Sequence, residues 1–266
     1  MNLPVFQIDA FASTPFQGNP AAIVPLSAWL PDEVLQHIAQ ENNLAETAFF
    51  VPENDGYHLR WFTPTVEVRL CGHATLASAF VLFEHLGFSD SEIRFRTLSG
   101  TLLVQKTGKL LTLDFPLDTP GPSDLSNMHF EKGLGIPILD SCRGKDDYLV
   151  RIPSLSLLES LVPDLTFIRS LKGARGLIVT TPGENTDFAS RCFYPATGVD
   201  EDAVTGSAHT LLAPYWAARL GKNTLSARQG GSRRGFLSCS VQGDRVKISG
   251  EAVTYLSGTI FLNATI

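Results

Sequence analysis

Two strongly apolar segments, about half the chain apart, dominate the hydrophobic pattern. The first predicts a helix over residues 73–86, and its apolar side chains cover nearly the whole circumference. A helix without a polar face is normally buried in a core. The second predicts a helix over residues 207–220. Each is followed by a glycine, Gly87 or Gly221, the residue that commonly ends a helix. The pattern therefore predicts two core helices.

The two segments also resemble each other residue by residue. The matching pairs are Gly72/Gly206, Ala74/Ala208, Ala79/Ala213, Leu86/Leu220 and Gly87/Gly221. The offset is 134 residues (206 minus 72) at every pair, about half of the 266-residue chain. Chance similarity of two alanine-rich helices is the alternative, and the constant offset argues against it. We expect two similar halves, residues 1–115 and 116–266, with the final strand at 255–266 as a candidate to join the first half.

The rest of the chain alternates in short apolar runs that end at glycines, a pattern typical of strands. Strands are expected over residues 5–11, 21–24, 59–62, 92–97, 101–105, 110–115, 148–152, 176–181, 189–194, 224–228, 236–241, 246–249 and 259–262. An amphipathic helix is expected over residues 31–42 with Pro31 at its first position, and a short helix over 156–161. Residues 123–170 otherwise give a less regular pattern. The fold class is therefore α/β (α+β), rich in strands.

Composition narrows the class of protein. Apolar residues make up 44% of the chain and charged residues 18%, as in a globular protein with a large core. The net charge of −6 argues against nucleic acid and anionic membranes as partners. No apolar run reaches the roughly 18 residues of a membrane span, and the N-terminus shows no export signal. The four cysteines form no CxxC pair, which predicts neither a zinc site nor disulfides. We expect a cytoplasmic protein without a bound metal.

Both predicted helices begin at residues that suit anion binding. The N-termini at Gly72-His73 and Gly206-Ser207 present unpaired backbone N–H groups and partial positive charge. A lone histidine is more often a capping or core residue, and that alternative stays open for His73. Its repeat partner, Ser207, also stands at a helix start, which favours a functional role for both.

Four further positions could be structural or functional. Asn19 lies in a Gly-Asn-Pro turn, so a tight connection is favoured over an amide aimed into a pocket. Glu46 begins an apolar strand; in such a pattern it is usually exposed, but burial would raise its pKa as a proton-transfer group requires. Asp200 and Glu201 precede a predicted helix and could be solvated capping acids. The loop at 229–235 is interpreted as a hairpin loop, with gripping a substrate as the alternative.

Five blocks, in this order and at these separations, resemble the PhzF-like (phenazine biosynthesis-like) family across essentially the whole chain. They are Gly18-Asn19-Pro20, Glu46-Thr47-Ala48-Phe49, Arg60-Trp61-Phe62-Thr63-Pro64, Cys71-Gly72-His73-Ala74-Thr75 and the segment from Glu201 to Ala208. The resemblance implies a diaminopimelate epimerase-like fold of two pseudo-symmetric halves. Each half would be a curved, mostly antiparallel sheet around a central helix, with the active site in the cleft between the halves. It implies no metal and no organic cofactor, and it allows a homodimer.

The resemblance also implies roles for single residues. The isomerase that names the family moves a proton within a dihydro-hydroxyanthranilate ring. By match to its motif, Glu46 would be the general acid/base, and His73 and Asp202 the supporting polar groups. The substrate, a small anionic molecule, would be held by Gly72, Gly206, Ser207 and Asn19. We expect a cofactor-independent isomerase of a small carboxylate-bearing metabolite.

Two rival interpretations remain. The two-base epimerases of the same fold use one cysteine from each half, just before the glycine that opens each helix. Here the first position is Cys71, but its repeat partner is Thr205, a poor base near neutral pH, so Cys71 is expected to be a small buried residue. Arg69 also departs from the family pattern. A member that binds a metabolite or a protein partner without turnover is the second rival, which the Glu46, His73 and Asp202 set argues against.

Overall fold

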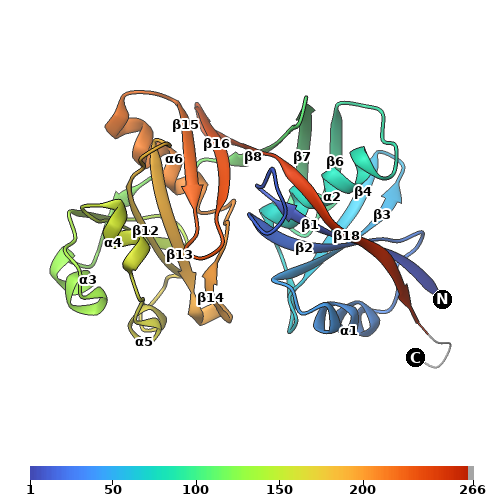
Figure 1. The fold of residues 1–266 in the computed structure, drawn as a ribbon, viewed down its shortest axis with the longest axis horizontal. Helices are drawn as coiled ribbons and strands as arrows, with labels where there is room; N and C mark the ends of the chain where they lie inside the picture. The colour runs from blue at the N-terminus through green and yellow to red at the C-terminus, as the bar shows by residue number, and fades with distance from the viewer. Residues whose placement is uncertain (263–266) are drawn as a thin grey trace. The chain divides into compact units, whose positions relative to one another are not determined.

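The computed structural model describes residues 1–262, which divide into two compact units (Figure 1). Unit 1 is Met1–Asp114 together with the segment that starts at Ser249, and unit 2 is Phe115–Ile248. The C-terminal segment, a candidate for the first half in the sequence pattern, therefore belongs to unit 1, and the division after Asp114 lies one residue from the expected 115/116. Of the strand expected at 255–266, residues 263–266 lie outside the described part of the chain. No helix within residues 1–262 is long and apolar enough to cross a membrane.

Unit 1 is a mostly antiparallel sheet with helix α2 packed on it. Its strands are β1 (Asn2–Ala10), β2 (Asn19–Pro25), β3 (Glu46–Glu53), β4 (Gly56–Phe62), β5 (Glu67–Val68), β6 (Glu92–Thr97), β7 (Gly100–Thr107), β8 (Leu110–Pro116) and β18 (Ala252–Phe261). Its helices are α1 (Asp32–Asn42) and α2 (Gly72–Glu84). The strand order is β18-β1-β2-β3-β4-β6-β7-β8, with β2/β3 and β4/β6 parallel. Helix α2 packs on β1, β2 and β3, and all of it except Phe80 and Glu84 is buried.

Unit 2 is likewise built of strands and a buried helix. Its strands are β9 (Gly121–Pro122), β10 (Asp140–Arg143), β11 (Asp147–Arg151), β12 (Gly176–Pro182), β13 (Phe188–Tyr194), β14 (Val199–Asp202), β15 (Thr224–Gln229), β16 (Gly235–Gln242) and β17 (Arg245–Gly250). Its helices are α3 (Asn127–Leu134), α4 (Leu155–Ser160), α5 (Leu165–Arg169), the 3-10 turn η1 (Pro195–Thr197) and α6 (His209–Leu220). Helix α6 packs on β15 and β16.

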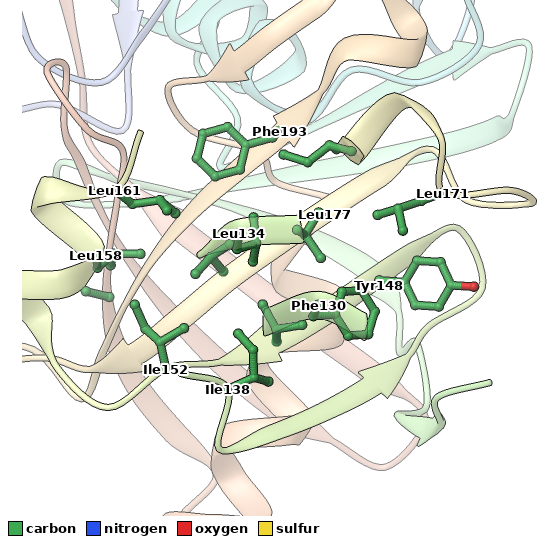
Figure 2. Packing of buried hydrophobic residues seen from close by; sticks show 14 residues of the cluster. Phe130, Leu134, Ile138, Tyr148, Ile152, Leu158, Leu161, Leu171, Leu177 and Phe193 are labelled. Carbon is green, nitrogen blue, oxygen red and sulfur yellow. The ribbon is translucent and has the colours of Figure 1, made fainter. Parts of the chain in front are cut away.

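The smaller helices of unit 2 enclose an apolar core of their own. Figure 2 shows this cluster, in which Phe130 and Leu134 of α3 and Leu158 of α4 pack against Tyr148, Leu177 and Phe193 of strands β11, β12 and β13. Thirteen of the fourteen residues of the cluster are aliphatic or aromatic side chains with at most 7% exposure, and the fourteenth is Ala189. Burying such side chains contributes about 1.5–3 kcal/mol each, which explains why short helices with weak periodicity are held here.

Both core helices and nearly all predicted strands are present, with differences at their ends. Helix α6 begins at His209 rather than at 207, because His209 and Thr210 donate to the carbonyls three residues earlier, in the turn that precedes the α-helix. Helix α2 ends at Glu84 rather than at 86. Pro31 is the N-cap of α1, with the extended angles φ −53° and ψ 142°, and not its first helical residue.

Other elements carry no clear sequence signal. Helices α3 and α5 and strand β10 lie in the stretch without regular periodicity. Strand β18 runs over ten residues, far longer than the predicted 259–262. Most of it is exposed, so the sequence shows no alternating pattern there, and its pairing with β1 defines the strand. Asp200 and Glu201, the candidate capping acids, lie in strand β14. Glu201 within it is not a solvated cap, since both of its oxygens accept from Arg191 of β13, at 2.8 and 2.7 Å.

Candidate active site

In unit 1 the candidate residues meet where two parallel strands begin. Asn19 is the first residue of β2, Glu46 is the first of β3, and the register pairs Ala21 with Glu46. Parallel strands that start together bring their first side chains to the same end of the strands. Because α2 packs on both strands, its first turn, from Cys71 to His73, reaches that end. The topology thus gathers three distant sequence blocks.

The turn before Asn19 requires glycine. Gly18 has φ +64°, and a Cβ at this position would lie 2.0 Å from the carbonyl oxygen of Ala10. Only glycine tolerates both the left-handed conformation and this approach. The turn interpretation is therefore right for Gly18, but the neighbouring Asn19 is more than a turn residue. It is 2% exposed, and its amide nitrogen lies 3.2 Å from Nδ1 of His73.

His73 is a buried, neutral donor. It is the second residue of α2, does not cap it, and is 4% exposed. Desolvation lowers its pKa to about 3, so the imidazole is uncharged near neutral pH. Because the Asn19 amide donates to Nδ1, the ring proton belongs on Nε2, which lies 3.2 Å from Oε2 of Glu46. The His73–Glu46 contact is thus a hydrogen bond from a neutral ring to a carboxylate and not an ion pair.

Glu46 is held by this hydrogen bond at the margin of the core. Its side chain retains 16% exposure, whereas Thr47 and Ala48, the next two residues of β3, have none. The carboxylate is therefore oriented by His73 while part of its surface remains accessible. A general base needs this combination of fixed direction and access to a ligand.

The Cys71 thiol lies over the face of the His73 ring. Its sulfur is 3.4 Å from Nδ1 and 3.9 Å from Nε2, whereas a partner in line with one nitrogen would be much farther from the other. Donor atoms of Glu46, Cys71 and His73 lie within 4.8 Å of one another, a set whose types could hold a metal. An imidazole binds a metal in the ring plane, so a sulfur above that plane does not form a chelate with either nitrogen.

In unit 2 the candidate Asp202 stands at the end of a chain of hydrogen bonds that passes through two other side chains. Asp202 ends β14, Thr205 lies in the segment before α6, and Gln229 ends β15. The Thr205 hydroxyl donates to Oδ2 of Asp202 at 2.6 Å, and the Gln229 amide donates to the Thr205 hydroxyl at 3.0 Å. Thr205 is 7% exposed and Gln229 is fully buried.

Ser207, the other polar candidate of unit 2, is bound by an arginine. Nη1 of Arg175 donates to the Ser207 hydroxyl oxygen at 3.0 Å, and the same guanidinium forms an ion pair with the buried Asp147. Arginine only donates, so the proton of the Ser207 hydroxyl is left to point elsewhere. Within the described residues, the backbone hydrogen bonds of the turn before α6 begin at the N–H of His209, so the N–H groups of Gly206 and Ser207 are candidate donors at the helix start.

Sequence reasoning missed the partners of these candidates. Arg175 and Asp147 lie in no motif, and in the sequence Gln229 is only the start of a loop. Each acts through a contact across the fold, for which a single sequence gives no signal. Of the expected site residues, the structure brings Asn19, Glu46, Gly72 and His73 together in unit 1, and Asp202, Gly206 and Ser207 lie near one another along the chain in unit 2.

Comparison with known proteins gives a consistent result. The profile described as "Phenazine biosynthesis-like protein" matches residues 8–258. An uncharacterized isomerase of Pseudomonas aeruginosa is 53% identical over 262 residues, covering 98% of this chain and all of that protein. A PhzF-family crystal structure from Enterococcus faecalis superposes with a TM-score of 0.95 at 43% identity, over 98% of this chain and all of that one.

A more distant structure shows how widely the fold is shared. A probable proline racemase from Agrobacterium radiobacter K84, with bound carbonate, has a TM-score of 0.64 at 11% identity, over 99% of this chain and 94% of that one. At this identity the likeness concerns the fold alone. Together with the Enterococcus structure it confirms the predicted epimerase-like α/β class. The chain therefore belongs to the phenazine biosynthesis-like (PhzF) family, and its curated bacterial relatives are named isomerases.

Proposed function

We propose that the protein is a cofactor-independent isomerase that moves a proton on a small carboxylate-bearing metabolite, with Glu46 as the general acid/base. The observation that carries the proposal is the carboxylate of Glu46, oriented by a buried, neutral His73 and still partly accessible. A carbon acid requires a base held over one face of the reacting carbon. The family membership of the chain supports the same reaction class.

The proposed reaction keeps atoms and electrons in balance within one substrate. Glu46 takes a proton from one carbon, so a C–H bond breaks, an O–H bond forms, and the electron pair delocalises toward the substrate carboxylate. The same O–H bond then breaks as the proton is delivered to a second carbon of the same molecule. His73 takes up no proton during the transfer, because its lowered pKa makes the imidazolium unfavourable. Its task is to hold Glu46 in one orientation.

The negative charge that develops on the substrate needs hydrogen-bond donors. The proposal assigns this task to the backbone N–H groups of Gly72 and Gly206 and to the Ser207 hydroxyl, and it assigns to Asn19 and Asp202 the polar contacts that orient the ring or chain of the substrate. Donors that are already oriented stabilise such charge without reorganising during the reaction. The Arg175 contact supports Ser207 as a donor, because it occupies the hydroxyl oxygen and leaves the proton for a ligand.

A racemase or epimerase of the same fold is the second candidate. A two-thiol mechanism would place one base at Cys71 and one at Thr205. The hydrogen-bond pattern opposes this, because the Thr205 proton already points to Asp202 and the Cys71 sulfur lies over the His73 ring. A member that only binds a metabolite would need neither proton transfer nor the oriented carboxylate.

Two probes in deuterated water separate these functions. The protein is incubated with a dihydro-hydroxyanthranilate and, separately, with L-proline, and deuterium incorporation is followed by NMR. The proposal predicts deuterium at ring carbon together with isomerisation of the first probe. Exchange at the α-carbon of proline with racemisation would favour the epimerase. The melting temperature is also measured with each probe. A rise in melting temperature without exchange on either probe would favour a binding protein. The absence of both a rise and exchange would contradict the proposed substrate class.

A further inference from the structure

We propose that Thr205 and Gln229 are positioning residues that fix the carboxylate of Asp202 for the proton transfer, as His73 and Asn19 fix that of Glu46. The proposal rests on the proposed function for its catalytic meaning, since it assigns a task to residues around Asp202. Its geometric part concerns unit 2 alone and stands on a chain of hydrogen bonds whose directions can be worked out.

The direction begins at Gln229, whose amide uses all of its polar groups. Its nitrogen donates to the backbone carbonyl of Asp202 at 2.9 Å and to the Thr205 hydroxyl at 3.0 Å, and its oxygen accepts from the backbone N–H of Thr205 at 3.0 Å. Exchanging the amide oxygen and nitrogen would set N–H against N–H and carbonyl against carbonyl. The orientation of this buried amide is therefore fixed by its partners.

The orientation of Gln229 decides the role of the Thr205 hydroxyl. Both amide hydrogens of Gln229 are committed, and one of them points to the hydroxyl oxygen, which must accept it. The single proton of the hydroxyl is then directed to Oδ2 of Asp202, 2.6 Å away. A hydroxyl in this arrangement is a donor to a carboxylate and not a base. The position that repeats Cys71 thus serves the neighbouring carboxylate.

Gln229 is held on a rigid part of the fold. Strand β15, which it ends, pairs with β13 on one side and β16 on the other. The next residue, Gly230, has φ +109°, and a Cβ there would lie 2.0 Å from the carbonyl oxygen of Arg233 and 2.9 Å from that of Ala203. Glycine therefore closes the hairpin directly against the segment that leads to Thr205. Positioning side chains on such anchored elements keep a site more precise than side chains on loops.

Thr180 offers a matched control for the loss of a buried hydroxyl. It has no exposure, and its hydroxyl donates to the Ala189 carbonyl at 2.8 Å and accepts from the Trp216 indole at 3.0 Å. Thr180→Val thus removes a fully buried, doubly bonded hydroxyl from the same unit without touching Asp202. Any effect that Thr205→Val shares with this control is an effect on folding.

The experiment compares the wild type with Thr205→Val, Thr205→Ser, Gln229→Glu and Thr180→Val. Deuterium exchange is measured on a dihydro-hydroxyanthranilate, with kcat and KM separated, and crystal structures are determined for the two Thr205 variants. Thr205→Val removes the hydrogen bond to the Asp202 carboxylate, and Gln229→Glu removes the amide donor that directs it. Each should lower kcat about tenfold to hundredfold, with KM within about threefold. Thr205→Ser should restore most of kcat, and Thr180→Val should lower only the melting temperature.

The outcomes separate the two proposals. A wild type that exchanges no probe proton overturns the proposed function for this substrate class. The positioning role is then decided by the crystal structures, which should show the Asp202 carboxylate rotated in Thr205→Val and unmoved in Thr205→Ser. The same Asp202 rotamer in Thr205→Val and the wild type overturns the positioning role. If the wild type exchanges and Thr205→Val retains the kcat of Thr180→Val, the positioning inference alone is overturned.

Discussion

Each of the two units holds a carboxylate by a chain of the same form. In unit 1 the Asn19 amide donates to the His73 imidazole, which donates to Glu46. In unit 2 the Gln229 amide donates to the Thr205 hydroxyl, which donates to Asp202. In both, the amide and the carboxylate stand at strand ends and the middle group stands beside the start of a buried helix. The middle group alone differs in chemical type.

The difference shows that positions paired by the sequence repeat do not have the same roles. His73 is the repeat partner of Ser207, yet its task in unit 2 is performed by Thr205, the partner of Cys71. Ser207 is bound by Arg175 instead, and the Cys71 sulfur lies over the imidazole face. Both middle groups are neutral donors, the imidazole because burial lowers its pKa to about 3. One requirement, a neutral donor for a carboxylate, is met by unrelated side chains that stand two positions apart when the two repeats are aligned.

The largest expected effect comes from removing the carboxylate of unit 1. Glu46→Gln keeps the shape of the side chain and removes the base, so the exchange rate of a dihydro-hydroxyanthranilate should fall by a factor on the order of 10²–10⁴. Affinity for the probe, measured by calorimetry, should change much less, because the remaining donors are intact. An exchange rate within a few-fold of the wild type would remove Glu46 from the proposed role.

Sequence patterning predicts the parts of this fold whose burial is periodic. Helix α2 is buried nearly all round and α6 over most of its surface, and both show in the sequence as apolar segments with a glycine after them. Strand β18 and helix α5 do not show, because the first is largely exposed and the second is five residues long. Their conformation follows from pairing with β1 and from packing on β12 and β13.

The candidate site divides in a similar way. Glu46, His73 and Asp202 stand in sequence blocks that suggest a role for each of them. The groups that orient them do not stand in such blocks: Gln229 acts on Thr205 and Asp202 across 24 and 27 residues of chain, and Arg175 acts on Ser207 across 32. Such partners are set by strand pairing and helix packing, so a single sequence carries no local trace of them.

A moderate effect is expected on the pH dependence of stability, because each unit buries one neutral histidine. Burial lowers the pKa of His73 to about 3 and that of His209 to about 4, whereas an unfolded histidine titrates near 6.5. Between these values the unfolded state binds protons that the folded state does not. The free energy of unfolding should therefore fall as the pH drops from about 6.5 toward 3–4, by about 1.4 kcal/mol per pH unit for each histidine.

The variant His209→Asn separates the contribution of unit 2. Its amide can still donate to the Thr205 carbonyl, as Nδ1 of His209 does at 2.9 Å, but it does not titrate. The free energy of unfolding is measured by urea unfolding at several pH values between 4 and 7. Its slope against pH should be smaller in the variant, by close to one proton. An unchanged slope would mean that His209 is not kept neutral by the fold.

The smallest effect is expected from the thiol of unit 1. The Cys71 sulfur lies over the ring of His73, whereas the contact that orients Glu46 comes from Nε2 of His73, so Cys71→Ala should change the exchange rate by no more than a few-fold. Cys71→Ser serves as the control for size and polarity. If activity were lost in Cys71→Ala while Glu46→Gln remained active, the thiol-based epimerase would replace the proposed mechanism.

The most direct test of the account asks whether the carboxylates of both units act in one reaction. Deuterium exchange of a dihydro-hydroxyanthranilate is measured for the wild type, Glu46→Gln, Asp202→Asn and the double variant. Residues that act as a unit in one step have strongly non-additive effects. We predict that the exchange rate of the double variant lies no more than a few-fold below that of the less active single variant. A loss equal to the product of the two single losses would show that Glu46 and Asp202 act independently and would contradict the account.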